Sequence, residues 1–354
     1  MLSALRRCLA LAAGPAVLLL LTTAVASADG PAWTTISDDF QSPLFGLAVA
    51  PGHRLMVADA GAGPTELRGT TASLAFDLPG VTDVAPIGRG DMLATVSSET
   101  EQALYRVSRG HASRIADLGA FETAKDPAGD GPESNPFDLA RTNGGNTFVA
   151  DAAGNDILAV DNSGHIDWVA VLPKEDLPTA AAKQAAGCPH PSNPDLAFVC
   201  DLPDVIPADP VPTTVAVGPD GFLYAGELKG FPANQGTSRI WRIDPAARHV
   251  NCGTDPGCTL VNTGPFTSII DLNFGPDGTA YVVELDEASF AAFDFGIPPE
   301  GGTVNACTVN GATWSCTEKA TGLPIPTAVA IDGSNVYVTL NSLVPGQAQV
   351  ALLP

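Results

Sequence analysis

The sequence predicts an all-β protein folded as a six-bladed β-propeller, in which the N-terminal strand joins the C-terminal blade and closes the ring. Three observations predict this fold. One two-strand phrase recurs six times within 354 residues, the spacing of its copies fits four short strands per unit, and the two chain ends supply the parts of one shared unit.

The repeated phrase consists of an apolar strand, a turn rich in Gly and Asp, a second apolar strand and, in four copies, a final acidic residue. Two clear copies read VPTTVAVGPDGFLYAGELKG (211–230) and SIIDLNFGPDGTAYVVELDE (268–287). Alignment places one apolar residue at an equivalent position in each copy, namely Leu47, Val84, Leu139, Val215, Leu272 and Val329. Spacings from 37 to 76 residues are too long for a solenoid and suit four short strands per unit.

Each phrase is predicted to form a β-hairpin, because its turn contains a Gly that readily adopts positive φ. The third and fourth strands of one unit are visible at 155–161 and 166–172. These strands are almost continuously apolar, as expected for sheets covered on both faces by neighbouring blades.

The chain ends favour a closed ring over an open sandwich. The sixth phrase is followed by only one more strand, at 347–353, whereas an unassigned strand at 32–40 precedes the first phrase. That N-terminal strand would complete the sixth blade as its outer strand. Closure of this kind removes the exposed edges of an open sheet.

Residues 1–28 are predicted to be a signal peptide, with Arg6 and Arg7 as its basic segment, an apolar stretch at 9–25 and small residues at its end. The arginine pair leaves open the choice between general and twin-arginine export. No later segment approaches the ~20 apolar residues that span a bilayer. We therefore expect a secreted or extracytoplasmic bacterial protein whose residues 29–354 form a single propeller domain.

The formal net charge is −22, and loss of the signal peptide's arginines would make it more negative. Such a surface repels nucleic acid and anionic lipid headgroups, and it attracts cations and basic partners. Nucleic-acid binding is thereby excluded from the functions considered.

Six cysteines follow the signal peptide, and six cysteines allow 15 connectivities. Each nearest-neighbour pair lies in one loop or hairpin, so we expect local disulfides in an exported protein. A zinc site is the less favoured alternative, since the Cys252–Cys258 pair has no His or second close thiolate pair beside it. The expected pairs are Cys188 with Cys200, Cys252 with Cys258, and Cys307 with Cys316.

Three segments resemble a known group: SNPFDLA followed by FVADAAGNDILAVD (134–161), VPTTVAVGPDGFLYAGELKGFP (211–232) and IIDLNFGPDGTAYVVEL (269–285). They resemble NHL-type and gluconolactonase-type six-bladed propellers and, more narrowly, the secreted ScyD/ScyE family. The resemblance covers roughly residues 40 to 345 and supports the fold more than any activity.

Four acidic residues end second strands and are expected around the mouth of the central channel: Asp59, Asp151, Glu227 and Glu284. Such a set could hold Ca²⁺ or a cationic ligand, because hard cations prefer several oxygens. The alternative is that each carboxylate accepts hydrogen bonds from its neighbouring loop. Hydrogen bonding to the neighbouring loop is the favoured interpretation for Asp59 and Asp151. Glu227 and Glu284 are the candidate ligands if a metal binds.

The gluconolactonase-like resemblance implies metal-binding Asn, Asp or Glu at the start of several inner strands. The matching residues here are poor ligands: Phe45, Thr82, Phe137, Thr213, Ile270 and Thr327. Asp83, Asp138 and Asp271 follow one residue later, where an extended strand would point them to the opposite side. These three remain candidates near the mouth, but the lactonase interpretation loses its metal site.

Three loops are expected over the mouth. An insertion at 173–210 would form a flap containing one short helix within 177–187, and the loops at 228–236 and 285–302 bring Phe231 and three further phenylalanines. Aromatic rings beside carboxylates suit an aromatic or cationic ligand. Alternatively, these rings anchor their own loops.

Two functions remain. The favoured one is a monomeric, non-catalytic binding or scaffold propeller that engages a small molecule or an extracytoplasmic protein at the mouth. The alternative is a metal-dependent hydrolase, lactonase-like enzyme or lyase acting on an exported metabolite. In that alternative, Glu227, Glu284 and the inner-strand aspartates would recruit a divalent cation such as Ca²⁺.

Overall fold

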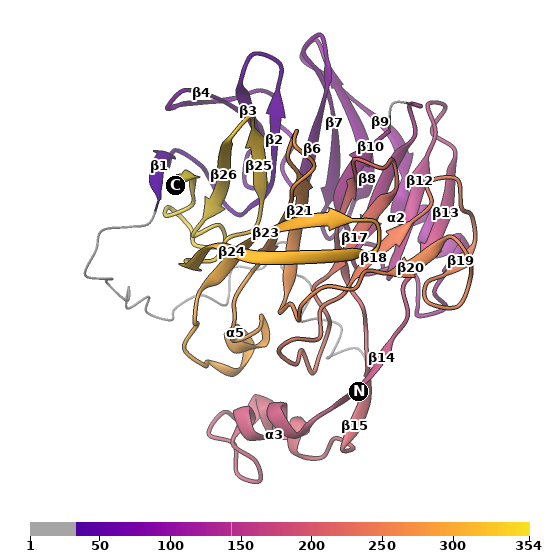
Figure 1. The fold of residues 1–354 in the computed structure, drawn as a ribbon, viewed down its shortest axis with the longest axis vertical. Helices are drawn as coiled ribbons and strands as arrows, with labels where there is room; N and C mark the ends of the chain where they lie inside the picture. The colour runs from indigo at the N-terminus through magenta and orange to yellow at the C-terminus, as the bar shows by residue number, and fades with distance from the viewer. Residues whose placement is uncertain (1–32, 143) are drawn as a thin grey trace.

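The computed structural model describes residues 33–142 and 144–354, so the signal peptide predicted over 1–28 lies outside the described residues. Six antiparallel sheets of four strands follow one another along the chain, one of them extended by a short fifth strand (Figure 1). The inner strands contact one another in a closed cycle, β2–β6–β10–β16–β21–β25 and back to β2. The predicted six-bladed propeller is therefore confirmed.

The first three blades take up the N-terminal half of the chain, and blade 3 carries β19 as a fifth, parallel strand on its outer edge. Blade 1 contains β2 (Leu44–Ala50), β3 (Arg54–Asp59), β4 (Gly63–Arg68) and β5 (Thr71–Leu74). Blade 2 contains β6 (Val81–Gly88), β7 (Asp91–Ser97), β8 (Gln102–Ser108) and β9 (His111–Asp117). Blade 3 contains β10 (Pro136–Arg141), β11 (Thr147–Asp151), β12 (Asp156–Val160), β13 (Ile166–Val171) and β19 (Val250–Asn251).

The remaining blades follow the same order, with the first strand at the channel. Blade 4 contains β16 (Pro212–Val217), β17 (Leu223–Glu227), β18 (Ile240–Ile243) and β20 (Cys258–Leu260). Blade 5 contains β21 (Ile269–Phe274), β22 (Ala280–Glu284), β23 (Gly302–Asn310) and β24 (Thr313–Leu323). Blade 6 contains β25 (Val329–Asp332), β26 (Asn335–Leu340), β27 (Gln349–Leu353) and β1 (Thr34–Ser37).

The ring closes as the chain ends predict. Strand β1 pairs antiparallel with β27, with Thr34 opposite Leu352 and Thr35 opposite Ala351. The outer strand of blade 6 thus comes from the N-terminus and its other three strands from the C-terminus.

The hydrophobic core is divided into clusters that lie between successive blades. Between blades 3 and 4, for example, Ile157 and Phe148 pack with Trp241 and Ile243, and all four are buried. Burying one such side chain stabilises the fold by about 1.5–3 kcal/mol, so most of the packing energy lies at blade-to-blade contacts.

Five inner strands carry a β-bulge at their first residues, where two residues oppose one on the second strand. In three blades, the hydroxyl of a threonine at this level donates a hydrogen bond to a carbonyl at the start of the next inner strand. These bonds are Thr82 to Pro136 (2.6 Å), Thr213 to Ile269 (2.7 Å) and Thr327 to Leu44 (2.7 Å).

A second set of bonds between blades lies one residue further along the inner strands. Here a carboxylate accepts a hydrogen bond from a backbone N–H of the next blade, which satisfies a group that the sheet itself leaves unpaired. These bonds are Leu139 to Asp83 (3.2 Å), Val215 to Asp138 (2.7 Å) and Val329 to Asp271 (2.7 Å).

Two helices that the repeat pattern did not predict occupy connections between strands: α2 (Leu118–Lys125) and α5 (Ala291–Phe295). Asp117 caps the N-terminus of α2 by accepting a hydrogen bond from the Ala120 N–H at 2.9 Å. Asp126, with φ of 42°, ends that helix in a left-handed conformation.

The insertion at 173–210 forms a separate flap that stands off the body of the propeller (Figure 1). The predicted short helix is present as α3, and a two-stranded ribbon that was not predicted connects it to the blades. The flap contains β14 (Glu175–Pro178), α3 (Ala180–Ala186), the 3₁₀ helix η2 (Pro194–Leu196), α4 (Ala197–Cys200) and β15 (Val205–Ala208).

All three predicted disulfides are present: Cys188–Cys200 in the flap, Cys252–Cys258 in blade 4 and Cys307–Cys316 in blade 5. Three structural disulfides are typical of an extracytoplasmic, oxidising environment. Among the described residues, no helix combines the length and apolar character needed to cross a bilayer.

Close approach of blades 1 and 2 requires the glycine at position 46. A Cβ atom there would lie 2.8 Å from the Asp83 Cα and closer still to its carboxylate. We therefore expect Gly46→Ala to lower the free energy of unfolding by about 2 kcal/mol through overpacking, as measured by urea denaturation. Gly264→Ala is the control, because nothing lies within 4 Å of its added methyl group. Equal stability of the two variants would contradict this close packing.

Candidate functional site

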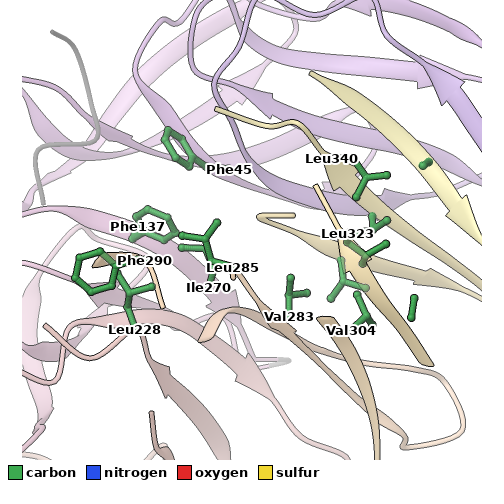
Figure 2. Packing of buried hydrophobic residues seen from close by; sticks show 14 of the residues in the cluster. Phe45, Phe137, Leu228, Ile270, Val283, Leu285, Phe290, Val304, Leu323 and Leu340 are labelled. Carbon is green, nitrogen blue, oxygen red and sulfur yellow. The ribbon is translucent and has the colours of Figure 1, made fainter. Parts of the chain in front are cut away.

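The mouth face is the face on which inner strands begin and second strands end. The loops at 228–236 and 285–302 and the base of the flap lie on it. Figure 2 shows part of a buried apolar cluster that includes residues of this face, among them Phe45, Phe137 and Phe290. The rings of Phe45 and Phe137 meet edge to face at 5.4 Å, and Ile270, Leu285 and Phe290 belong to the same buried cluster. Buried apolar side chains therefore pack together on this face.

Asp59 and Asp151 are buried and accept hydrogen bonds from their own loops. The carboxylate of Asp59 accepts from the backbone N–H groups of Gln41 (2.7 Å) and Gly61 (3.1 Å). That of Asp151 accepts from the Asn135 N–H (2.6 Å) and also from the Ser134 hydroxyl and the Gly154 N–H. Both side chains therefore support loops.

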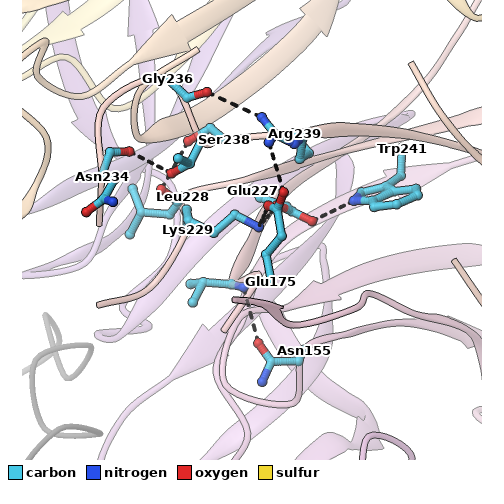
Figure 3. Close-up of polar contacts among 12 residues, drawn as sticks. Asn155, Glu175, Glu227, Leu228, Lys229, Asn234, Gly236, Ser238, Arg239 and Trp241 are labelled. Atoms are coloured by element: carbon cyan, nitrogen blue, oxygen red, sulfur yellow. Dashed lines mark hydrogen bonds and ion pairs between the residues drawn. The ribbon is translucent and has the colours of Figure 1, made fainter. Parts of the chain in front are cut away.

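Glu227 lies at the centre of a buried ionic network (Figure 3). Its carboxylate accepts a hydrogen bond from the indole N–H of Trp241 (2.5 Å) and contacts the ammonium group of Lys229 (2.6 Å). Lys229 also reaches Glu175 of the flap at 3.1 Å, and Glu175 in turn pairs with Arg239 at 2.9 Å. Burial raises the pKa of Glu227 to about 7 against the lowering effect of Lys229.

The carboxylate of Glu284 is also held by hydrogen-bond donors. Its carboxylate accepts hydrogen bonds from the Thr267 N–H and from the side-chain amide of Asn305, the latter at 2.6 Å. Burial raises its pKa to about 7, partly offset by the Thr267 N–H.

The four second-strand acids thus face separate groups of donors rather than one point. Across residues 33–142 and 144–354, no group of three or more His, Cys, Asp or Glu side chains is arranged to hold a metal ion by itself.

Phe231 packs against the flap. Its ring lies 6.4 Å from that of Phe198 in the flap and 6.2 Å from that of Phe295, which ends α5. Together with the Lys229–Glu175 ion pair, this contact fixes the flap to blades 4 and 5.

The three inner-strand aspartates line a cavity of about 350 Å³ that follows the central channel. It extends from Phe137 and Ile270 at the mouth to Val49, Val217 and Ile331 at the far ends of the inner strands. Any ligand in this cavity would therefore lie beneath the mouth cluster, between the inner strands.

Electrostatics couple these aspartates. The pKa of Asp83 is raised well above its usual range by burial and by the neighbouring charge of Asp138. Burial raises the pKa of Asp271 in the same way, and Asp138 adds to it. Thr82 and Asp83 follow each other at the bulge of β6, and both bond to the inner strand of blade 3.

No sequence pattern singled out five of the buried or ion-paired residues: Lys229, Glu175, Arg239, Glu122 and Asp156. Glu175 and Lys229 are 54 residues apart and meet only because the flap returns to blade 4. No local pattern marks such a pair, although a lysine two residues after a buried strand was a usable signal.

Loss of the buried ammonium group should destabilise the protein far more than loss of a surface one. Lys229→Met leaves Glu227 and Glu175 without their shared cation, so we expect a loss of about 3 kcal/mol in unfolding free energy. The matched control, Lys183→Met, removes a 3.4 Å pair with the fully exposed Asp204 and should cost less than about 1 kcal/mol. Chemical denaturation of both variants checks this, and similar losses would refute the role of Lys229.

Stability should fall as the pH rises from about 5 to 7. Glu284 has a pKa of about 7 in the folded protein and an ordinary value of 4.5, so in this window the folded state holds a proton that the unfolded state has lost. The penalty from this residue reaches about 3 kcal/mol at pH 7 and above. Urea denaturation across this range should show a shallower pH slope for Glu284→Gln than for the wild type. An unchanged slope would contradict the assignment.

No family model matches the chain, and no curated protein matches it by sequence. Solved structures of similar fold include the PQQ-bound aldose sugar dehydrogenase from Streptomyces coelicolor (14% identity, TM-score 0.54, covering 90% of this chain and 95% of that one). A gluconolactonase from Xanthomonas campestris is similar as well (12%, 0.54, 91% and 89%). So is an inactive virginiamycin B lyase from Staphylococcus aureus with quinupristin (14%, 0.52, 89% and 96%). The chain is thus a six-bladed β-propeller related in fold to lactonase, lyase and sugar dehydrogenase structures.

Proposed function

We propose that this protein is an exported, non-catalytic binding propeller that engages a protein partner over its mouth face. One observation carries the proposal: the side chains that would build a reaction centre at the mouth are committed to the fold. Phe45 and Phe137 pack against each other, and Glu227 and Glu284 are held by local donors.

A cavity of about 350 Å³ lies along the channel, below the mouth cluster, and none of its lining residues belongs to the flap. A partner on the mouth face would therefore meet a surface, which suits a protein better than a small molecule.

The flap has the properties of a docking platform. The Cys188–Cys200 disulfide ties its helices together, and Phe231 and Lys229 hold it to the blades. Its exposed carboxylates favour a partner with a basic surface. These are Asp176, Asp195, Asp201 and Asp204.

Two further observations support an extracytoplasmic role within this proposal. The N-terminal 28 residues have the pattern of a signal peptide, and the three disulfides suit an oxidising compartment. The segments at 134–161, 211–232 and 269–285 are those by which the chain resembles the secreted ScyD/ScyE family.

An enzymatic alternative is favoured by the similar structures, which include a gluconolactonase and a virginiamycin B lyase. In that case Glu227 and Glu284 would bind a divalent cation such as Ca²⁺. Glu227 would have to give up the Trp241 indole and Lys229, and Glu284 would have to give up Asn305. The cost of breaking these buried contacts places this function second.

Site-specific photocrosslinking in the native host would test the binding function. A photoreactive amino acid at Val205, 51% exposed on the flap, should give a discrete adduct that weakens at high salt. The matched control is Leu74, 52% exposed on the outer strand of blade 1, which should give none.

Two results would count against the proposal. The first is identical adducts from both positions, or none from the flap. The second is turnover of lactone or ester substrates by the purified protein that disappears in the double variant Glu227→Gln/Glu284→Gln, which would favour the enzymatic alternative.

A further inference from the structure

Three buried carboxylates meet where α2 packs against the β11–β12 hairpin of blade 3. Asp151 ends β11 and Asp156 begins β12, and the two are directly opposite each other in the hairpin. Glu122 comes from α2. A Cβ atom built on Gly154, in the hairpin loop, would lie 3.2 Å from the carboxyl carbon of Asp151 and 3.3 Å from that of Glu122. Glu122 and Asp151 therefore approach the same point, and the hairpin register places Asp156 beside Asp151.

Two of these carboxylates have no partner. Glu122 and Asp156 are both 0% exposed, and all four of their carboxylate oxygens lack a hydrogen-bond donor among the described residues. Asp151 differs from them, because Ser134, Asn135 and Gly154 donate to it.

Other buried acids in this protein are compensated. Asp59 and Glu284 accept backbone N–H bonds, and the two remaining acid oxygens without a donor, on Glu175 and Glu227, contact the Lys229 ammonium group. Glu122 and Asp156 thus differ from these other buried acids, because neither a hydrogen-bond donor nor a cation compensates them among the described residues.

Nearby negative charges make it more costly for Glu122 and Asp156 to be ionised. Burial, together with the charges of Asp151 and Asp126, raises the pKa of Glu122 to about 8. The pKa of Asp156 is raised well above its usual range by burial and then by the charge of Glu122. The amino group of Lys174, at the base of the flap, is engaged by Asp130 and Asp209 at 2.8 Å each.

We propose that Glu122 and Asp156 bind a Ca²⁺ ion between α2 and blade 3. Carboxylate oxygens are the ligands that this ion prefers, and its irregular coordination tolerates a site built from a helix and a hairpin. Two carboxylates do not complete a shell of six to eight oxygens, so water molecules fill the remaining positions. Asp151 adds negative charge beside them.

This site is independent of the proposed binding function and of the mouth acids Glu227 and Glu284. Its role would be to tie α2, which follows blade 2, to the hairpin of blade 3. An extracytoplasmic protein meets calcium at concentrations that sites of modest affinity can use, with dissociation constants on the order of 0.1 to 1 mM.

Thermal unfolding of the purified exported protein would test the site. After removal of metal with a chelator, about 10 mM Ca²⁺ should raise the melting temperature by about 3 °C, and Mg²⁺ should raise it less. Calorimetric titration should show one Ca²⁺ bound per chain.

Two conservative variants identify the ligands. Glu122→Gln and Asp156→Asn should each weaken Ca²⁺ binding at least tenfold and abolish the thermal shift. In chelator, both should be at least as stable as the stripped wild type, because each removes an uncompensated buried charge. The matched control is Glu284→Gln, which alters a buried acid that has donors and should keep the full calcium response.

The proposal is overturned if calcium leaves the wild type unchanged, because Glu122 and Asp156 are then simply protonated. It is also overturned if both ligand variants keep the shift. A calcium response lost only in Glu284→Gln would place the ion at the mouth and support the enzymatic alternative instead.

Discussion

The structure depends on side-chain hydrogen bonds that join neighbouring inner strands around the channel. The residue at this level alternates along the blades between threonine and a large apolar side chain: Thr82, Thr213 and Thr327 in the even blades, and Phe45, Phe137 and Ile270 in the odd ones. The threonines bond to the next blade, and the apolar residues meet at the mouth. The residues at the start of the inner strands therefore both join neighbouring blades and pack together at the mouth.

This arrangement limits the chemistry available at the mouth. A propeller enzyme needs polar side chains that are free to face a substrate, whereas here Asp83 and Asp138 bond to neighbouring inner strands. Glu227 neutralises Lys229, and that lysine also holds the flap. Converting any of these residues to a ligand would remove a bond between two parts of the fold, so stability and catalysis would compete for the same groups.

The sequence predicted the blade number, the ring closure and the disulfides, because each rests on a repeat or on local spacing, as with Cys252 and Cys258. It predicted that acidic residues lie around the mouth, but not which hydrogen-bond donors contact them. Glu227 meets Trp241 and Lys229 only after blade 4 and the flap have folded. Helix α2 escaped the repeat pattern because it lies in a connection between blades, where its Asp117 cap was the one local signal.

The pairing of β1 with β27 also orders events in time. A chain made from its N-terminus presents β1 well before β27, so blade 6 stays incomplete until β27 has been made. Blades 1 to 5 have all their own strands earlier and can form as the chain emerges, apart from the late β19 edge on blade 3. Until β27 is available, β1 lacks its neighbour in the sheet and the ring stays open, so the pairing of β27 with β1 is the step that closes the propeller.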